Sequence, residues 1–181
     1  MDRDWFHLAR DPALGIEGLQ AKLDTYAYGR HAHETYAIGV CEAGSQTFTC
    51  RGTRQRTRPG SVMLLEPFEL HDGHATTGDG VVYRMLYLPH ARLRRALEHE
   101  DIRVDPGFAD TVVDDPVLAC AVTALGRALA LSRDALVTAE RHAELVSALA
   151  RAGGPTPHAC PDTPTRSRES ATCCTRASPN Q

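Results

Sequence analysis

The stretch GRHAHETYAIGVCEAG, residues 29–44, carries the pattern that decides the fold. Its central part, residues 36–41, is rich in Tyr, Ile and Val, which favour extended strands, and a turn sequence follows it. Successive side chains of a strand alternate between its two faces, so His31 and His33 point the same way, about 6.6 Å apart along the strand. Glu34 has the opposite parity and joins them only through a bulge.

The two faces of this strand differ in size. The face that carries the histidines continues with the small side chains of Thr35, Ala37, Gly39 and Cys41, and the other face carries Tyr36, Ile38 and Val40. If the small face looks inward, it leaves room for a ligand. If it looks outward, the large face forms the core and the histidines lie at the rim. The sequence leaves both arrangements open.

Four further runs of strand-forming residues surround the first one. They cover residues 19–25, 47–50, 61–65 and 81–87, and turn sequences that contain glycine separate them. Short strands spaced about 8–12 residues apart are typical of a β-sandwich or barrel rather than of alternating strands and helices. The sequence therefore predicts a mainly β fold, with a β-barrel domain over residues 1–88.

The hydrophobic period becomes helical over residues 89–153. A short helix is expected over residues 91–98. A second helix is expected to begin at Pro116, because proline is favoured at the first helical position and Asp114 or Asp115 can cap it.

A third helix is expected after Ser132, which can act as its cap, and before Gly153, which can end it. The second and third helices both carry stripes of leucine and alanine that must be buried. The stripes either pack back on the β-domain or form a dimer interface, and the sequence favours neither.

The overall composition excludes several classes of protein. The 181 residues have a net charge of −3, so the basic face that DNA-binding domains usually present is not expected. Charged residues open the chain instead of a secretory signal, and the longest uncharged apolar stretch, residues 116–126, is too short to span a bilayer. The six cysteines do not resemble a disulfide framework. We therefore expect a cytoplasmic protein without membrane contact.

Residues 154–181 differ in character from the rest of the chain. From Pro155 onward they contain no Leu, Ile, Val, Met, Phe, Tyr or Trp, and they hold five of the eleven prolines. A segment with so little to bury is expected to be disordered. Zinc binding by His158 and the three cysteines of this tail is disfavoured, because adjacent Cys173 and Cys174 fit none of the usual ligand spacings.

Two motifs resemble those of the cupin superfamily. The first is residues 29–33 with Gly44 as its closing glycine, and the second is Pro59-Gly60 with His71 eleven residues after the glycine. In a catalytic cupin a metal-binding glutamate stands four residues after the second histidine of the first motif, where this chain has Ala37. The resemblance implies a cupin-like double-stranded β-helix barrel with at most three metal-binding histidines.

The order of the motifs is similar to that of the N-terminal effector-binding and dimerisation domain of AraC-type transcriptional regulators. The likeness is carried by HAHETY (31–36), EAG (42–44), PGS (59–61), EP (66–67), HDGH (71–74), YRMLY (83–87) and VVDDPVLA (112–119). It extends over about residues 19–152. It implies a small β-barrel pocket for an effector, followed by two or three α-helices that pair two subunits.

Members of that family continue with two helix-turn-helix units, each of which places one helix in a major groove. Residues 155–181 have no apolar periodicity for such a unit, and they contain three arginines and no lysine. We therefore expect a truncated regulator, through a frameshift or as a genuine short form, that does not bind DNA directly. The expected partner is a second copy or a full-length relative. Coding potential for a helix-turn-helix in the downstream DNA tests this expectation.

The resemblance implies a set of ligand-binding residues at the pocket or its mouth, namely His31, His33, Glu34, Tyr36 and His71. Their side chains suit a polar or anionic small-molecule effector. The protein is expected to act without catalysis and without a cofactor, because an effector acts by favouring one arrangement of subunits or domains.

Two other interpretations stay open. A metal-dependent cupin enzyme of the dioxygenase or isomerase type would use His31, His33 and His71 as ligands of a divalent transition metal, with a position open for substrate. Alternatively, the histidines only form hydrogen bonds with turns of the barrel, which is the most frequent role for any single histidine. Stoichiometric metal that is lost on His31→Ala or His71→Ala would favour the enzyme.

Overall fold

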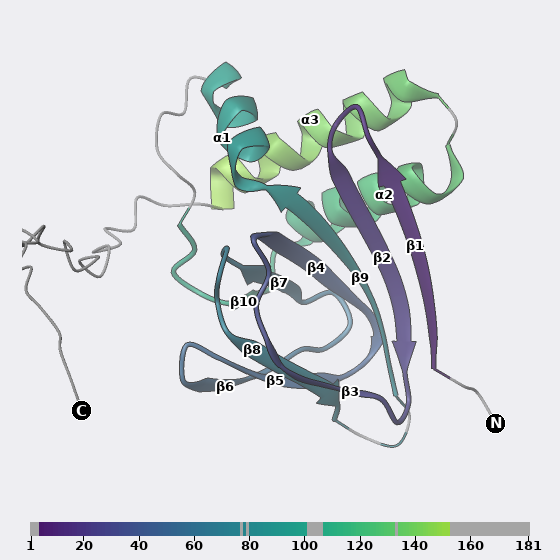
Figure 1. Cartoon of the computed structure of the whole chain (residues 1–181), viewed down its shortest axis with the longest axis vertical. Coiled ribbons are helices and arrows are strands. Elements are labelled where there is room, and N and C mark those ends of the chain that lie inside the picture. The colour runs from purple at the N-terminus through teal and green to yellow at the C-terminus, as the bar shows by residue number, and fades with distance from the viewer. Residues whose placement is uncertain (1–3, 77, 79, 101–106, 133, 153–181) are drawn as a thin grey trace, which may run out of the picture.

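The computed structural model describes residues 4–76, 78, 80–100, 107–132 and 134–152. The strands are β1 (Trp5–Asp11), β2 (Ile16–Leu23), β3 (Ala27–His31), β4 (Thr35–Gly44), β5 (Gln46–Cys50), β6 (Thr53–Arg56), β7 (Val62–Leu65), β8 (His71–Ala75), β9 (Val81–Pro89) and β10 (Val112–Val113). The helices are α1 (His90–His99), α2 (Pro116–Leu131) and α3 (Ala135–Ala152). Figure 1 shows the strands gathered in a barrel and the helices beside it.

The strands pair in a nested order. β5 pairs with β6, β4 with β7, β3 with β8 and β2 with β9, all antiparallel. Successive pairs belong to opposite sheets, a six-stranded one in the order β1-β2-β9-β4-β7-β10 and a four-stranded one in the order β3-β8-β5-β6. Two sheets nested in this way face each other as a double-stranded β-helix barrel (Figure 1). The predicted fold class, mainly β with this barrel followed by helices, is confirmed.

The inner strands of the six-stranded sheet are buried on both faces, because one face lines the barrel and the other carries the helices. On β4, Ala37 and Cys41 belong to the core inside the barrel, whereas Ile38 and Val40 belong to the core under the helices. The two arrangements that the sequence left open are therefore combined. The small face of this strand looks into the barrel, and its large face still forms a core.

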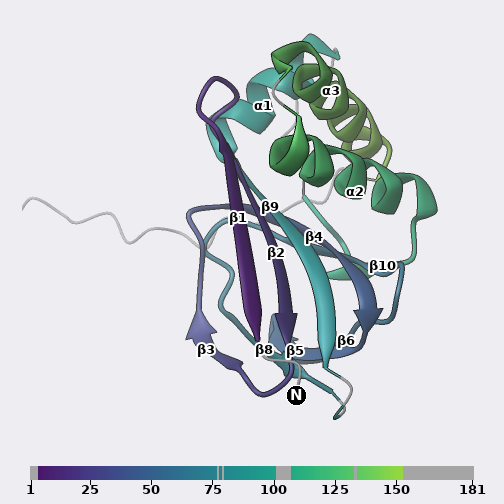
Figure 2. The same ribbon diagram turned by 90° about the vertical axis from the view of Figure 1, so that its right-hand side faces the viewer.

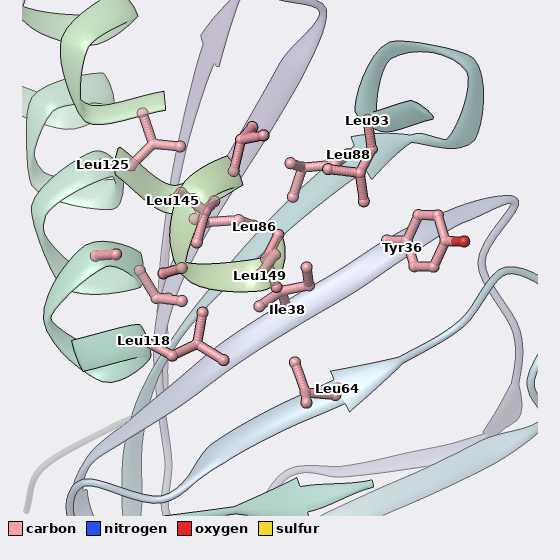
Figure 3. Packing of buried hydrophobic residues seen from close by; sticks show 14 of the residues in the cluster. Tyr36, Ile38, Leu64, Leu86, Leu88, Leu93, Leu118, Leu125, Leu145 and Leu149 are labelled. Carbon is pink, nitrogen blue, oxygen red and sulfur yellow. The ribbon is translucent and has the colours of Figure 1, made fainter. Parts of the chain in front are cut away.

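The core under the helices joins all three helices to the sheet. Leu118 and Leu125 of α2 and Leu145 and Leu149 of α3 are fully buried in it, and they surround Leu86 of β9 (Figure 3). Figure 2 shows α2 and α3 lying one above the other against the same side of the sheet. The inner leucine stripes of the helices thus pack on the β-domain of their own chain.

The capping residues explain where the helices begin. Asp115 caps α2 as predicted, since its Oδ1 accepts hydrogen bonds from the backbone N–H of Val117 at 2.9 Å and of Leu118 at 3.0 Å. The prediction that Ser132 caps α3 is wrong, because Ser132 ends α2 by donating its N–H to the carbonyl oxygen of Ala128. The carboxylate of Asp134, which accepts from the N–H of Leu136, takes that role. The expected tail over residues 154–181 lies outside the described residues.

Candidate functional site

Three histidines meet at one end of the four-stranded sheet. His31 is the last residue of β3 and stands opposite His71, the first residue of β8, in the antiparallel register. His33 lies in the connection that leads from β3 to β4. The ring centroids are 4.4 Å apart for His31 and His71, 4.9 Å for His31 and His33, and 5.2 Å for His33 and His71. The sequence spacing and the strand pairing together produce this cluster.

Backbone carbonyl groups orient two of the three rings. Nδ1 of His31 lies 2.8 Å from the carbonyl oxygen of Gly29, and Nδ1 of His71 lies 2.8 Å from that of Glu69. A carbonyl oxygen can only accept, so in both rings Nδ1 carries a hydrogen, and in the neutral form of each ring Nε2 keeps a free lone pair. The cluster therefore offers nitrogen acceptors to whatever binds beside it.

The surroundings disfavour the charged form of two of the three rings. Burial, together with repulsion from the neighbouring His71 and His31, lowers the pKa of His33 to about 4. Burial also lowers the pKa of His71, against the opposing effect of its hydrogen bond to the Glu69 carbonyl group. Two of the three imidazoles are thus neutral at pH 7, which suits hydrogen bonding or metal binding better than pairing with an anion.

The cluster opens onto a cavity of about 140 Å³ inside the barrel. The cavity is lined by Leu19, Tyr28, His31, His33, Gln46, Phe48, Met63, Leu65, His71, Asp72, Tyr83, Met85 and Tyr87. Water occupies roughly 30 Å³ per molecule in the liquid, so the space equals about five waters. It has an apolar and aromatic wall with a few polar groups, as is typical of small-molecule sites.

Gln46 lines this cavity and carries an unsatisfied polar atom. Its residue is 7% exposed, and within the described parts of the chain its Oε1 is the one buried side-chain oxygen or nitrogen without a hydrogen-bond partner. Its amide packs against the backbone of Gly73, because a Cβ added to Gly73 would lie only 2.6 Å from Nε2 of Gln46. A buried polar atom without a partner costs about 1–3 kcal/mol, so a ligand that donates to Oε1 would relieve that cost.

Two tyrosines add a polar pair to the same wall. The hydroxyl of Tyr83 donates to the hydroxyl of Tyr28 at 2.9 Å. Tyr28 therefore keeps its own hydroxyl hydrogen for another acceptor, and Tyr28 lines the cavity. Burial raises the pKa of Tyr87 to about 12, so this third tyrosine remains a neutral hydroxyl.

Two of the residues expected at the pocket lie elsewhere. Glu34 is exposed in the connection before β4 and is absent from the described lining of the cavity. Tyr36 is 3% exposed in the core under the helices, where its ring lies 5.9 Å from those of His90 and Phe108. The structure brings together His31, His33 and His71 but not these two, because Glu34 is exposed to solvent and Tyr36 faces the helix side of the sheet.

The tyrosines that line the cavity were not predicted from the sequence. Tyr83 and Tyr87 alternate with Leu86 and Leu88 along β9, and this period of two was a usable signal for one inward face. Which face looks inward depends on the pairing of β9 with β2 and β4, and the sequence alone does not show that pairing.

The histidine cluster fits a divalent transition metal in part. One nitrogen from each of His31, His33 and His71 lies within 4.8 Å of the others, and the free Nε2 of two rings is the form that binds a metal. Ala37, at the position of the cupin glutamate, is fully buried in the barrel and offers no ligand atom. Three imidazoles would hold a metal with open coordination positions.

Residues 13–150 match the family model of the AraC-like ligand binding domain. The match covers most of the chain, so this protein belongs to the family of AraC-like ligand-binding domains. A curated relative, the uncharacterized HTH-type transcriptional regulator YbfI of Bacillus subtilis (strain 168), is 29% identical over 79 residues. The aligned part is 44% of this chain and 29% of the relative, so the chain spans less than a third of that protein. The family resemblance drawn from the sequence is confirmed.

Several solved structures resemble part of the chain. A Cupin 2 conserved barrel domain protein from Salinispora arenicola is 19% identical, covers 53% of this chain and 84% of its own, and has a TM-score of 0.44. KdgF from Halomonas sp. is 21% identical with 46% and 77% coverage and a TM-score of 0.41. No helix of the described residues is both long enough and apolar enough to span a membrane.

Proposed function

We propose that residues 4–152 form the effector-binding and dimerisation module of a cytoplasmic AraC-type transcription regulator. The cavity inside the barrel is the effector site, with His31, His33, His71 and Gln46 as its polar contacts. The observation that carries this proposal is Gln46, which lines the barrel cavity and whose buried Oε1 has no hydrogen-bond partner among the described residues. Reading of DNA is not part of the role that we assign to these residues.

The chemistry of the wall defines the class of effector. Gln46 Oε1 and the lone pairs of the histidine rings accept hydrogen bonds, whereas the Tyr28 hydroxyl can donate one. Aromatic rings form much of the remaining surface. A small, uncharged molecule with at least one hydroxyl or amino donor and an apolar face satisfies these groups.

A thermal-shift screen of small polar compounds tests this assignment. An effector raises the melting temperature because it binds the folded state and stabilises it by about 2.7 kcal/mol at a hundred times Kd. Gln46→Leu and His31→Ala should each remove the stabilisation by a hit, and Gln55→Leu on β6, outside the cavity, should retain it. A hit that stabilises both cavity variants as well as the wild type would place the effector elsewhere.

The second half of the proposal concerns the outer faces of α2 and α3. These helices flank a groove of about 800 Å³ that contains Val117, 58% exposed, with Cys120 and Ala124 beside it. Glu144 and Arg151 stand along the same groove and provide both signs of charge. A surface with an apolar centre and charges of both signs can pair with its own copy about a twofold axis.

A metal-dependent cupin enzyme is the second candidate function, and the two backbone hydrogen bonds that free Nε2 of His31 and His71 support it. His31, His33 and His71 would hold the metal, which would supply a Lewis acid for an oxygen of the bound molecule. Metal analysis of purified protein separates the candidates. Stoichiometric iron, nickel, manganese or zinc that disappears in His31→Ala and His71→Ala, but not in His74→Ala, would support the enzyme against the sensor.

A further inference from the structure

A second cavity lies on the opposite side of the six-stranded sheet from the barrel interior. It has a volume of about 670 Å³ and is bounded by the helix-facing side of the sheet and by α2. Its polar lining residues are His7, Gln20, Glu42, Arg84, Thr123 and Arg127. Neither the histidine cluster nor Gln46 contributes to it, so it is separate from the proposed effector site.

A buried arginine forms the floor of this second cavity. Arg84 of β9 is 6% exposed, and its aliphatic part runs beneath α2 at Gly126. A Cβ at Gly126 would lie 2.2 Å from Cδ of Arg84, so α2 needs glycine there. Glycine inside a helix costs about 1 kcal/mol relative to alanine. The glycine that makes room for Arg84 therefore makes α2 itself less stable at this point.

The ion pair of Arg84 leaves part of its guanidinium group available. Nε donates to Oε1 of Glu42 at 2.9 Å, and Nε2 of Gln20 donates to Oε2 of Glu42 at 2.6 Å. Both carboxylate oxygens are thus engaged. Within the described residues Nη1 and Nη2 of Arg84 have no hydrogen-bond acceptor, and they are not sealed from the cavity that Arg84 lines. Two parallel N–H donors of this kind match a carboxylate.

The rest of the lining selects the charge and shape of the ligand. Arg127 and His7 add basic groups, and Glu42 is the one acid among the described lining residues. Because Glu42 already shares the charge of Arg84, a single negative charge fits the floor better than the double charge of a phosphate. Leu131 of α2, 77% exposed, provides an apolar rim.

We propose that this cavity is a second ligand site, specific for a small monocarboxylate with a short apolar body. The carboxylate binds the Nη1 and Nη2 edge of Arg84, and the apolar body lies against Leu131 of α2. Because its walls come from the sheet and from α2, an occupant ties the helix to the barrel. The site is independent of the effector role of the barrel cavity.

Calorimetric titration of the full chain with sodium hexanoate, and with hexanamide as the uncharged control, tests the proposal. Hexanoate should bind at least about ten-fold more tightly than hexanamide, since hydrogen bonds to charged groups are worth about 1.5–3 kcal/mol. The double variant Arg84→Met/Glu42→Gln removes both charges and keeps an acceptor for Gln20. It should weaken hexanoate binding about ten-fold or more and leave hexanamide binding unchanged.

Ala130→Phe provides a test that leaves every charge in place. Ala130 is an exposed residue of α2 that lines the cavity, so the larger side chain should block hexanoate. Ala135→Phe, at an exposed position of α3 outside the lining, is the matched control and should bind normally. This pair decides the question if the double variant does not fold.

Three results would overturn the site itself, and a fourth would overturn its ligand class. The first is equal affinity for hexanoate and hexanamide in the wild type. The second is full hexanoate affinity in Ala130→Phe. The third is loss of hexanoate binding in Gln46→Leu, which would place the carboxylate in the barrel. Tighter binding of phenyl phosphate than of hexanoate, dependent on Arg84, would overturn the choice of a carboxylate.

Discussion

Gln46 is expected to lower the stability of the folded protein and to contribute to effector binding. Its amide reaches the barrel cavity, and its Oε1 has no partner among the described residues. Replacing a buried, unsatisfied group by an apolar one of similar shape is neutral or stabilising. Natural sites often keep such costs because function requires them.

Gln46→Leu should therefore raise the free energy of unfolding of the ligand-free protein by about 1 kcal/mol while abolishing effector binding. Urea denaturation measures the first effect, and the thermal-shift hits measure the second. Gln55→Leu, a partly exposed position on β6, is the control and should change neither. A marked loss of stability in Gln46→Leu would show that the amide supports the barrel itself.

His33 makes stability depend on pH. Its folded-state pKa of about 4 lies below the value of about 6.5 in an unfolded chain, so between these values the unfolded state binds more protons. Stability should therefore fall as the pH drops from about 6.5 to 4. In His33→Asn the decrease between pH 7 and pH 5 should be smaller by about 1 kcal/mol, allowing for solvent screening.

Urea denaturation at the two pH values, with EDTA present, measures the difference for His33→Asn. His74→Asn is the control, since His74 is exposed on β8 and lies outside the cluster. The same pH dependence in His33→Asn as in the wild type would contradict the assignment to His33.

Gly126→Ala should destabilise the protein by about 1–3 kcal/mol, although alanine normally favours a helix. The reason is the 2.2 Å approach of the new Cβ to Cδ of Arg84. Gly29→Ala on β3 is the control, because a Cβ there meets nothing within 4 Å. Urea denaturation of both variants checks the sign, and a more stable Gly126→Ala would mean that Arg84 moves aside freely.

The residues of the site were predictable only in part. The two-residue spacing of His31 and His33, together with the motif around His71, predicted that the three would converge. The roles of Gln46 and Arg84 were not predictable from the sequence. The role of Gln46 depends on a buried oxygen without a hydrogen-bond partner among the described residues, and that of Arg84 depends on a cavity beneath α2. Such features exist only after distant strands have paired.

At the scale of elements, the cap of α2 is the clearest link between sequence and structure. Asp115→Ala should cost about 0.5–2 kcal/mol, because two backbone N–H groups at the start of α2 lose their acceptor. Asp110→Ala, at an exposed position before β10, is the control. The two free energies of unfolding are compared by urea denaturation, and equal values would mean that water replaces the carboxylate without cost.

The strands differ in how well the sequence predicts them. The central strands β4 and β9 were expected because both carry long runs of apolar residues. The short strands β3, β6 and β8 carry glycine, arginine and histidine, and the edge strand β1 is largely exposed. Their hydrogen bonds to neighbours hold them in the sheets, and a hydrophobic period does not reveal such pairing.

At the scale of the whole molecule, the groove between α2 and α3 leads to a test of dimerisation. Val117→Asp places a charge at the centre of the groove and should shift the protein from dimer to monomer. Sedimentation velocity over a range of concentrations measures the change. Leu70→Asp, at a site 52% exposed before β8, is the control and should keep the dimer. A wild type that is monomeric at every concentration would contradict the proposed pairing.

The two-sided burial of the six-stranded sheet has a consequence for how this protein can change over evolution or by design. Along β9, Tyr83, Met85 and Tyr87 shape the effector cavity, while Leu86 and Leu88 anchor the helices. Alternate positions of β9 thus determine the shape of the cavity and the packing of the helices. Residues of one set can be substituted without changing the residues of the other. A slip of one residue would exchange the two sets together, so the register of β9 protects binding and helix packing at the same time.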